Sequence, residues 1–581
     1  MSAIAPIVEM LQGGSVAILW SGRNPQDLDV APDGQIRPLR VILEQVLAER
    51  LGMVLLSYTK AMGVEYTTTV VRETGMLDRV EAALRAHELL ASWDLDFFMR
   101  NLWTFLRSPA EIRWPDGRRV RFVILIQFAE DLFPHEFTGR SEEEVRAAEW
   151  IQLLSRSPAL HQVGNALIVH VPDAGRIDPR VREVFHEVVL PQPDRKAKEV
   201  FLGALRRLYP KAHLEADLED QEVAYLTAHT PNWSLVEFFR WSHCTGQPVS
   251  SRELIRRQAA DVVALSEGML SSMGGAAPPL WGRTLDHAWR ILKRIALGLR
   301  RGDPRTPHNV LLCGGPGFGK TALALRMASE VGINAYRLHS PKAGIVGETE
   351  QRARLLFEIL HQWAPNVGFV DEITEVFTTE RPEYDQDSGA SRAVIGAMLT
   401  YLGDESRRGR SLFLGATNCP WRMSDALRSR FEVIPVLMPP EPDYPAIVAG
   451  LAREIGGQDV SEEETQVQQA ASIFYAKGCS PRHIRSALEQ ICFLEEGRLG
   501  LQEILQAAQN FCGDTGRFSS IYCDLWAIRM TTSKAFFPWS QNPQHYPYPD
   551  YLCGLVDPKT GEVDREQLDR RLSELRPQVS I

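Results

Sequence analysis

One stretch, residues 310–321 (Val-Leu-Leu-Cys-Gly-Gly-Pro-Gly-Phe-Gly-Lys-Thr), constrains this chain more than any other. Val310 to Leu312 is an apolar run that predicts a buried strand, and Ala322 to Ala328 predicts a helix. The loop between them fits the pattern G-x-x-x-x-G-K-[ST] in the required strand-loop-helix context. Such a loop turns backbone N–H groups and a helix N-terminus toward a polyphosphate. The stretch therefore predicts a nucleotide site.

The polar side chains that end this loop have separate expected roles. Lys320 reaches the β- and γ-phosphates, and Thr321 offers its hydroxyl to Mg²⁺. The cofactors expected from the sequence are ATP and Mg²⁺. The predicted nucleotide contacts in this stretch are Gly314, Gly315, Pro316, Gly317, Phe318, Gly319, Lys320, Thr321 and Ala322.

Composition limits the class of protein. A chain of 581 residues predicts three or four domains, and 44% hydrophobic with 24% charged residues is typical of a soluble globular protein. No apolar run reaches membrane-spanning length, and Met1 to Met10 has no basic region of the kind that opens a signal peptide. The eight scattered cysteines favour a reduced, cytoplasmic compartment. A net charge of -10 disfavours a dedicated nucleic-acid binder.

The N-terminal part, residues 1–273, alternates strands with helices. Apolar runs predict strands at Val16 to Trp20, Phe122 to Ile126 and Ala166 to Val171, with helices between them. Alternation of this kind predicts a doubly wound parallel α/β sheet. A helical subdomain follows and runs to about Met273.

A flexible linker, Ser271 to Pro279, is expected to separate this part from a second α/β unit. The second unit spans residues 280–510 and ends in a helical lid from about Asp443. Residues 511–581 are aromatic and proline-rich, as in Phe536-Phe-Pro-Trp539, and lack a helical or strand period. We expect an extended segment that docks on the body by its aromatic side chains, and a partner-binding tail is the alternative.

Two further strands of the second unit end in polar side chains. Asn366 to Val370 leads into Asp371, which can hold the Mg²⁺ shell, and Glu372, which can polarise an attacking water. The strand Leu412 to Thr417 leads into Asn418, which can orient that water beside Glu372. These residues predict a catalytic site for phosphoryl transfer to water.

Three arginines are candidates for contacts to the nucleotide. Arg428 and Arg430 lie just before a strand, where a guanidinium can stabilise transition-state charge and can be supplied in trans. Arg482 starts a lid helix and can fold over the nucleotide. Surface ion pairs are the alternative for Arg428 and Arg482.

Together these motifs resemble those of the AAA+ ATPase family over residues 280–510. The resemblance implies a Walker A loop, a Walker B strand, a sensor asparagine, an arginine finger and a lid, and it implies a ring, expected to be hexameric. Residues 340–350 look like the pore-loop region of the AAA subgroup that remodels proteins, with Ile345, Val346 and Gly347 in the loop. Two departures are Ile345, where the family usually has an aromatic, and Arg482, which resembles an arginine that this subgroup typically lacks.

The first half repeats the second without its chemistry. Val123 to Phe133 aligns without a gap with Val367 to Phe377, which places Gln127 at Asp371 and Phe128 at Glu372. Similarly, Leu167 to Phe185 aligns with Phe413 to Phe431, and Ser21 to Pro25 lacks the Gly-Lys-Thr sequence. We expect residues 1–273 to be a degenerate AAA+-like module that binds no ATP. The alternative is an unrelated α/β domain.

The resemblance leads to the expected function: an ATP-hydrolysing ring of identical subunits that remodels or disassembles a protein partner, with no membrane span. One alternative is a nucleotide-gated scaffold or switch whose assembly state is set by ATP. A nucleic-acid motor or loader is a further alternative, but it needs a basic stripe that the pore-loop region lacks beyond Lys342. Protease motifs of the H-E-x-x-H and G-x-S-x-G types are absent from the sequence.

Overall fold

The chain divides into two units, Met1–Ser250 and Ser251–Ile581. The computed structural model describes residues 3–66, 75–89, 95–108, 111–135, 141–216, 218–228, 230–266, 268–339, 348–376, 388–456, 459–495 and 499–579. Among these residues, no helix combines the length and the apolarity needed to cross a bilayer. All eight cysteines are free thiols.

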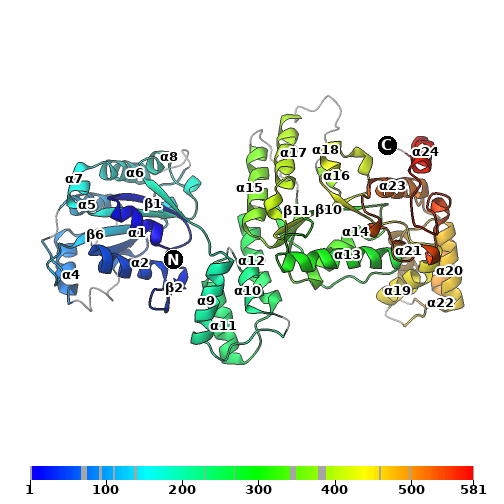
Figure 1. Cartoon of the computed structure of the whole chain (residues 1–581), viewed down its shortest axis with the longest axis horizontal. Coiled ribbons are helices and arrows are strands. Elements are labelled where there is room, and N and C mark those ends of the chain that lie inside the picture. The colour runs from blue at the N-terminus through cyan, green and yellow to red at the C-terminus, as the bar shows by residue number, and fades with distance from the viewer. Residues whose placement is uncertain are drawn as a thin grey trace. The chain divides into compact units, whose positions relative to one another are not determined.

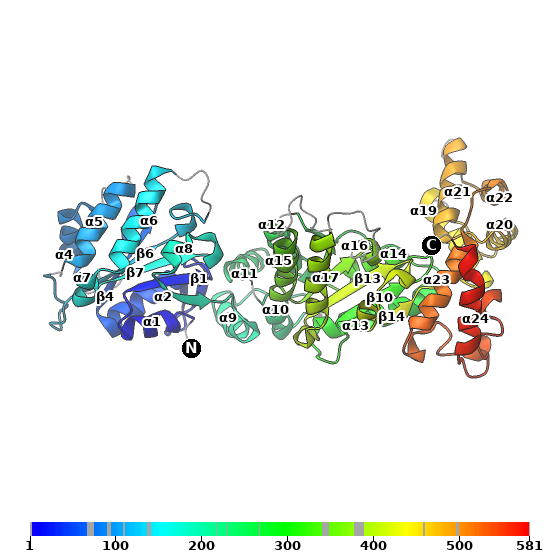
Figure 2. The same ribbon diagram turned by 90° about the horizontal axis from the view of Figure 1, so that it is seen from above.

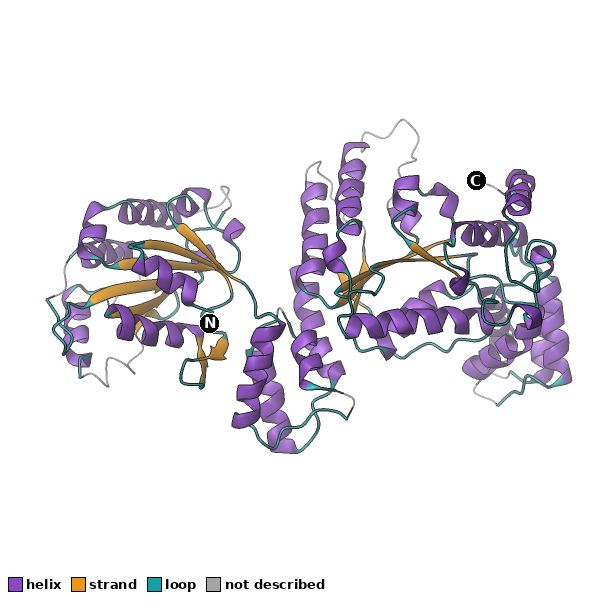
Figure 3. Cartoon of the chain, in the orientation of Figure 1, coloured by secondary structure: helices purple, strands orange, loops and turns teal. Residues whose placement is uncertain are grey.

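The first unit is a six-stranded sheet with helices on both faces (Figures 1 and 3). The sheet order is β5-β4-β6-β7-β1-β8, parallel except for the edge strand β5. Its strands are β1 (Ala17–Gly22), β4 (Met53–Thr59), β5 (Gly63–Tyr66), β6 (Arg121–Ile126), β7 (Ala166–Val171) and β8 (His186–Leu190), and a small ribbon pairs β2 (Leu28–Val30) with β3 (Ile36–Pro38).

Alternating side chains of this sheet build two apolar cores. Leu19, Ile124 and Val169 face one core, and Ile18, Val123 and Ile168 face the other. Helices α4 to α7 cover the first face, and α1 and α2 cover the second (Figure 2). A three-helix lid follows. The helices are α1 (Ala5–Gln12), α2 (Leu39–Val46), α4 (Leu77–Ala86), α5 (Leu95–Arg107), α6 (Glu142–Ser155), α7 (Pro158–Val163), α8 (Pro179–Arg182), α9 (Arg195–Leu208), α10 (Asp220–Leu226) and α11 (Trp233–Thr245).

The second unit repeats the order of the five parallel strands of the first. Its order is β14-β10-β13-β12-β11-β9, again parallel except for one edge strand, β9. Helix α13 lies on one face of the sheet, and α15 and α17 lie on the other (Figure 1). The strands are β9 (Leu270–Ser272), β10 (Asn309–Cys313), β11 (Asn334–Leu338), β12 (Asn366–Val370), β13 (Ser411–Thr417) and β14 (Glu432–Pro435).

The remaining helices of the second unit cover the sheet, form the lid and continue into the C-terminal segment. Helices α19 to α22 share an apolar core of their own, which makes the lid a separate layer. The helices are α12 (Ser251–Leu265), α13 (Arg283–Arg300), α14 (Lys320–Glu330), α15 (Glu348–Gln362), α16 (Ile373–Val376), α17 (Ser388–Leu402), α18 (Asp425–Arg428), α19 (Tyr444–Gly456), α20 (Thr465–Ala476), α21 (Pro481–Leu494), α22 (Leu501–Asn510), α23 (Arg517–Met530) and α24 (Arg565–Leu575).

Strand registers relate the two sheets residue by residue. Val123 pairs with Ala166 as Val367 pairs with Leu412, which is the correspondence expected from the sequence. In the neighbouring ladder, Leu167 lies opposite Ala17, and Phe413 lies opposite Asn309. Counting along β1 and β10 from these pairs places Arg23 at the position of Gly315. The five parallel strands of the two sheets therefore have the same order, and the ladders compared have the same register. The antiparallel edge strand differs, because β5 follows β4 in the chain whereas β9 precedes β10.

The boundary between the units differs from the expected one. Residues 251–273 belong to the second unit, not to the end of the first, because β9 adds an antiparallel edge strand to β11 and Gln258 accepts a hydrogen bond of 2.6 Å from the Asn334 side chain. Ser271 and Ser272, expected in a linker, lie in that strand. An isolated three-residue strand carries too little sequence signal to reveal its partner.

The C-terminal segment contains two helices that the expectation of an extended chain missed. Helix α23 is buried on several sides, so its apolar residues have no amphipathic period that would mark a helix. The expected aromatic docking is present: Phe537 and Trp539 stack with centroids 4.8 Å apart inside the main core of the unit. The Trp539 ring N–H donates to the Gly561 carbonyl at 3.1 Å.

Candidate active site

The phosphate loop lies between β10 and α14, and close contacts explain its glycines. A Cβ on Gly314 would lie 2.0 Å from the Val436 carbonyl oxygen, and a Cβ on Gly317 would lie 2.6 Å from the Ser480 hydroxyl. Gly319, with φ of 96°, precedes the first residue of α14. The segment directly after β14 and the start of the lid helix α21 therefore contact the loop from two sides.

Lys320 is buried under this loop. Its Nζ donates to the carbonyl oxygens of Gly314 and Gly315, both at 2.8 Å. Desolvation by burial lowers the pKa of Lys320, and the nearby Glu372 carboxylate opposes that shift. The ammonium group is therefore held by two carbonyl oxygens of the loop and interacts electrostatically with the predicted base, Glu372.

Thr321 and Asp371, the two residues predicted to hold Mg²⁺, have their side chains in contact. The Thr321 hydroxyl lies 3.1 Å from one Asp371 carboxylate oxygen and 3.4 Å from the other. Hydroxyl and carboxylate oxygens are the hard ligands that Mg²⁺ prefers, and a phosphate-binding loop lies beside them. The residues present therefore fit a magnesium–nucleotide complex.

Glu372 lies at the carboxyl end of β12 in a left-handed backbone conformation, with φ of 50°. Its carboxylate accepts a hydrogen bond of 3.3 Å from the backbone N–H of Asn418. Desolvation raises the pKa of Glu372, while Lys320 and the Asn418 N–H hold it down. The strand ends of β12 and β13 thus meet, as expected from their polar termini.

The three candidate arginines differ in their surroundings. Arg428 forms an ion pair with Asp425 and lies with its guanidinium 5.7 Å from the Trp526 ring centroid. Arg430 is exposed and donates to the Ala426 carbonyl at 2.6 Å. Arg482 is also exposed, and its Cβ lies 3.0 Å from the position of a Cβ on Gly317, beside the phosphate loop. The predicted pore-loop residues Ile345, Val346 and Gly347 lie outside the described residues.

One part of the site was missed at the sequence level. Asp524 of α23 accepts a hydrogen bond of 3.3 Å from the Gly315 backbone N–H, and its neighbour Cys523 donates to the Asn418 carbonyl at 2.7 Å. The C-terminal segment therefore contacts both the phosphate loop and the residue beside the predicted base. Its sequence carries no motif that would have indicated these contacts.

The equivalent edge of the first sheet has different chemistry. Gln127 and Phe128 follow β6 as Asp371 and Glu372 follow β12, and Phe128 also has a left-handed backbone with φ of 55°. Gln127 donates to the Ser57 hydroxyl and accepts from Gln26 at 3.2 Å. No carboxylate stands at either position.

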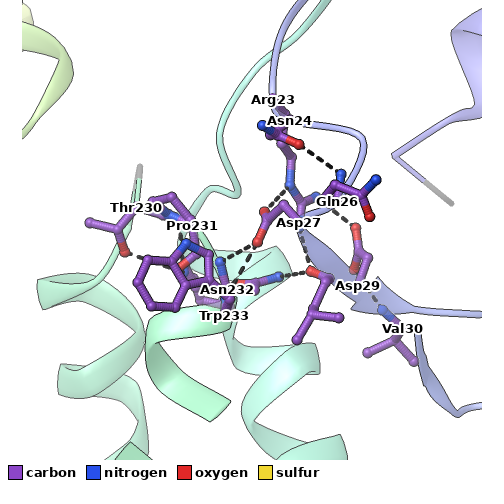
Figure 4. A network of polar contacts seen from close by, with 12 residues as sticks. Arg23, Asn24, Gln26, Asp27, Asp29, Val30, Thr230, Pro231, Asn232 and Trp233 are labelled. Atoms are coloured by element: carbon purple, nitrogen blue, oxygen red, sulfur yellow. Dashed lines mark hydrogen bonds and ion pairs between the residues drawn. The ribbon is translucent and has the colours of Figure 1, made fainter. Parts of the chain in front are cut away.

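Where a phosphate loop follows β10, the first unit has a polar network (Figure 4). The buried Arg23 guanidinium pairs with Asp27 at 2.6 Å and with Asp29 at 2.7 Å. Asp27 in turn accepts from the backbone N–H of Asn232, which starts the lid helix α11, at 2.8 Å. Lys198, also buried, donates to the Thr230 carbonyl at 2.8 Å. These side chains tie the lid to the sheet.

One family model matches the part of the chain that contains the candidate site. Residues 310–437 match the family model described as "ATPase family associated with various cellular activities (AAA)". The chain is 35% identical over 144 residues to Protein SAV of Sulfolobus acidocaldarius, covering 24% of this chain and 18% of that one. It is 30% identical over 195 residues to the katanin p60 ATPase-containing subunit A1 of Strongylocentrotus purpuratus, covering 31% and 34%.

A further relative is a putative 26S proteasome regulatory subunit homolog of Methanothermobacter thermautotrophicus. This chain is 28% identical to it over 206 residues, covering 32% of this chain and 55% of the relative. In each of the three comparisons the match spans less than two thirds of the relative's own length.

Proposed function

The chain carries an AAA ATPase domain, and we propose that it hydrolyses ATP as one subunit of a hexameric ring that remodels or dismantles a protein partner. The observation that carries the proposal is the meeting of three polar groups at one sheet edge: the Thr321 hydroxyl, the Asp371 carboxylate and the Glu372 carboxylate held by the Asn418 N–H. This arrangement matches the requirements of phosphoryl transfer to water.

Each residue has a proposed role in that reaction. The loop amides and Lys320 bind the phosphates, while Thr321 and Asp371 hold Mg²⁺, whose chemistry is the neutralisation of phosphate charge. Glu372 accepts the proton of the attacking water, because burial raises its pKa while the carboxylate stays within reach of Asn418. Arg482 covers the nucleotide from the lid.

The arginine finger is the guanidinium that would act on the nucleotide of a neighbouring subunit. We assign it to Arg430 as the first candidate and to Arg428 as the second. Arg430 is exposed and uses only one N–H group on a backbone carbonyl, so its guanidinium can reach a neighbouring subunit. Arg428 is engaged by Asp425 and lies close to Trp526, which lowers its freedom to extend. A guanidinium supplied by a neighbour would stabilise charge on the transferred phosphoryl group.

The first unit is proposed to be a degenerate module without nucleotide. Its Arg23 is neutralised by two carboxylates, so it has no charge left to offer a phosphate. Gln127 cannot supply the charge of a carboxylate to Mg²⁺, and Phe128 cannot polarise water. We assign this unit a role in shaping the assembly or holding the partner.

A protein partner fits better than a nucleic acid. The net charge of -10 opposes binding to a polyanion, and the relatives include a proteasome regulatory subunit homolog and a katanin subunit. We further propose a cytoplasmic location, from the free thiols. A pore-loop grip by Ile345, Val346 and Gly347 belongs to the same proposal.

Capture of the partner by a variant that binds ATP without hydrolysing it tests the proposal. The full chain with Glu372→Gln, held in Mg-ATP, should form a ring that retains its partner, which mass spectrometry of the captured material identifies. Wild-type chain should hydrolyse ATP and release the same protein. ATP-dependent assembly with no turnover by the wild type would instead favour a nucleotide-gated switch, and capture of nucleic acid would favour a motor or loader.

A further inference from the structure

The C-terminal helix α23 is part of the wall of the nucleotide site. It packs against β10, the strand that leads into the phosphate loop, and against β14, the neighbour of β10 in the sheet (Figure 2). Its Ser520 Cβ lies 3.1 Å from the position of a Cβ on Gly315. Any side chain at that loop position would therefore strike the helix as well as the Phe318 ring, which lies at 2.7 Å.

Asp524 is the polar centre of this contact, and its side chain is fully buried. One carboxylate oxygen accepts from the Gly315 N–H at 3.3 Å, and the other accepts from the Met438 N–H at 2.8 Å and the Tyr551 hydroxyl at 2.7 Å. All three partners are donors, so the ionised carboxylate satisfies them together. A charged group held by several donors in a buried site is strongly oriented.

The contact with Gly315 has a consequence at Lys320. In the peptide group between Gly314 and Gly315, the N–H donates a hydrogen bond to the Asp524 carboxylate. The carbonyl oxygen of the same group accepts one from the Lys320 ammonium at 2.8 Å. A negative charge at one end of the peptide dipole and a positive charge at the other hold the same orientation. Two consecutive glycines have no Cβ to restrict their backbone, so this peptide depends on outside partners.

Cys523, the residue before Asp524, contacts a different part of the site. Cys523 donates from its thiol to the Asn418 carbonyl at 2.7 Å, and the Asn418 N–H donates to Glu372. Two adjacent residues of one helix therefore reach the phosphate loop and the strand end beside the proposed base.

We propose that Asp524 is a positioning residue of the nucleotide site: its carboxylate orients the Gly314–Gly315 peptide, so the C-terminal segment sets the affinity for ATP. The proposal rests on the proposed ATPase function. It assigns Ser520, Cys523 and Asp524 of α23 to the wall of the nucleotide site, where the sequence had left a partner-binding tail open.

The test compares two full-length variants. In Asp524→Asn the side-chain amide has only one oxygen, and when that oxygen serves Met438 and Tyr551 the NH₂ group faces the Gly315 N–H, donor against donor. The dissociation constant of a fluorescent ATP analogue should rise about tenfold, equivalent to about 1.4 kcal/mol, with turnover at saturating ATP within about twofold of wild type.

Tyr551→Phe is the matched control. It removes a donor from the same carboxylate but leaves the Gly315 contact intact, so it should lower thermal stability without changing ATP affinity more than about twofold. Wild-type affinity in Asp524→Asn would overturn the proposal. An equal loss of affinity in Tyr551→Phe would also overturn it, since the role would then be structural.

Hydrogen exchange in the wild-type chain provides a readout that does not depend on a stable variant. The Gly315 amide should exchange at least about 100-fold more slowly than in an unstructured peptide. A rapidly exchanging Gly315 amide would contradict the contact itself. Absence of ATP binding by the wild type would overturn the proposed function and this inference together, whereas unchanged binding by Asp524→Asn overturns the inference alone.

Discussion

Phe128 and Glu372 occupy equivalent positions, two residues beyond β6 and β12, and both have a left-handed backbone, with φ of 55° and 50°. Positive φ is uncommon outside glycine and costs free energy, so its presence at both positions reflects the same strand-to-helix turn. The turn aims one side chain at the edge of each sheet. In the second unit that side chain is a carboxylate, and in the first it is an aromatic ring.

Substitution of this pair should separate the two units functionally. Glu372→Gln is expected to bind ATP and to lower steady-state phosphate release by about 100-fold or more, because it removes the proton acceptor. Phe128→Gln, the matched change in the first unit, should leave phosphate release unchanged. Near-normal turnover of Glu372→Gln would show that another group is the base.

Lys320→Ala in the full chain should abolish saturable, magnesium-dependent binding of labelled ATP, since the buried ammonium is the principal positive charge at the loop. Lys293→Ala, an exposed lysine on α13, provides the control and should bind one ATP per chain. Residual saturable binding by Lys320→Ala would reveal a second site and contradict the assignment of the first unit as nucleotide-free.

Mixed assemblies should locate the arginine finger. If Arg430 acts on a neighbour's nucleotide, Arg430→Ala subunits mixed with Glu372→Gln subunits should recover part of the ATPase rate, because some interfaces then combine a good base with a good arginine. Arg422→Ala, an exposed arginine nearby, should retain the wild-type rate alone. No recovery at any ratio, with mixed assemblies verified by native mass spectrometry, would argue for an arginine acting within its own subunit.

The buried Lys198 predicts a pH dependence of stability in the first unit. Burial lowers its pKa from 10.5 to about 7, partly opposed by Asp27, so the folded chain holds fewer protons than the unfolded chain between about pH 7 and 10. Stability should therefore rise with pH through that window, by about 2 kcal/mol between pH 7 and 9. The urea midpoint of Lys198→Met should lack this rise, whereas Lys196→Met, exposed on the same helix, should keep it.

The placement of the candidate site residues in the second unit could be predicted because its determinants are short and contiguous. A phosphate loop needs its glycines, lysine and threonine at fixed spacing, and the acids must directly follow a buried strand. Local sequence therefore determined the positions of Lys320, Asp371 and Glu372 at one sheet edge. The same reasoning identified the repeated sheet, since equal spacing of apolar runs gives equal registers.

Contacts between distant residues were decided only by the tertiary structure. Asp524 lies more than 200 residues from Gly315, and nothing around it in the chain distinguishes a carboxylate on a phosphate loop from a solvated one. The short strand β9 joins the second sheet because β11 offers an unpaired edge. No local sequence pattern predicts this pairing. Burial and hydrogen-bond partners depend on what packs from elsewhere, so they emerge only when the whole chain is folded.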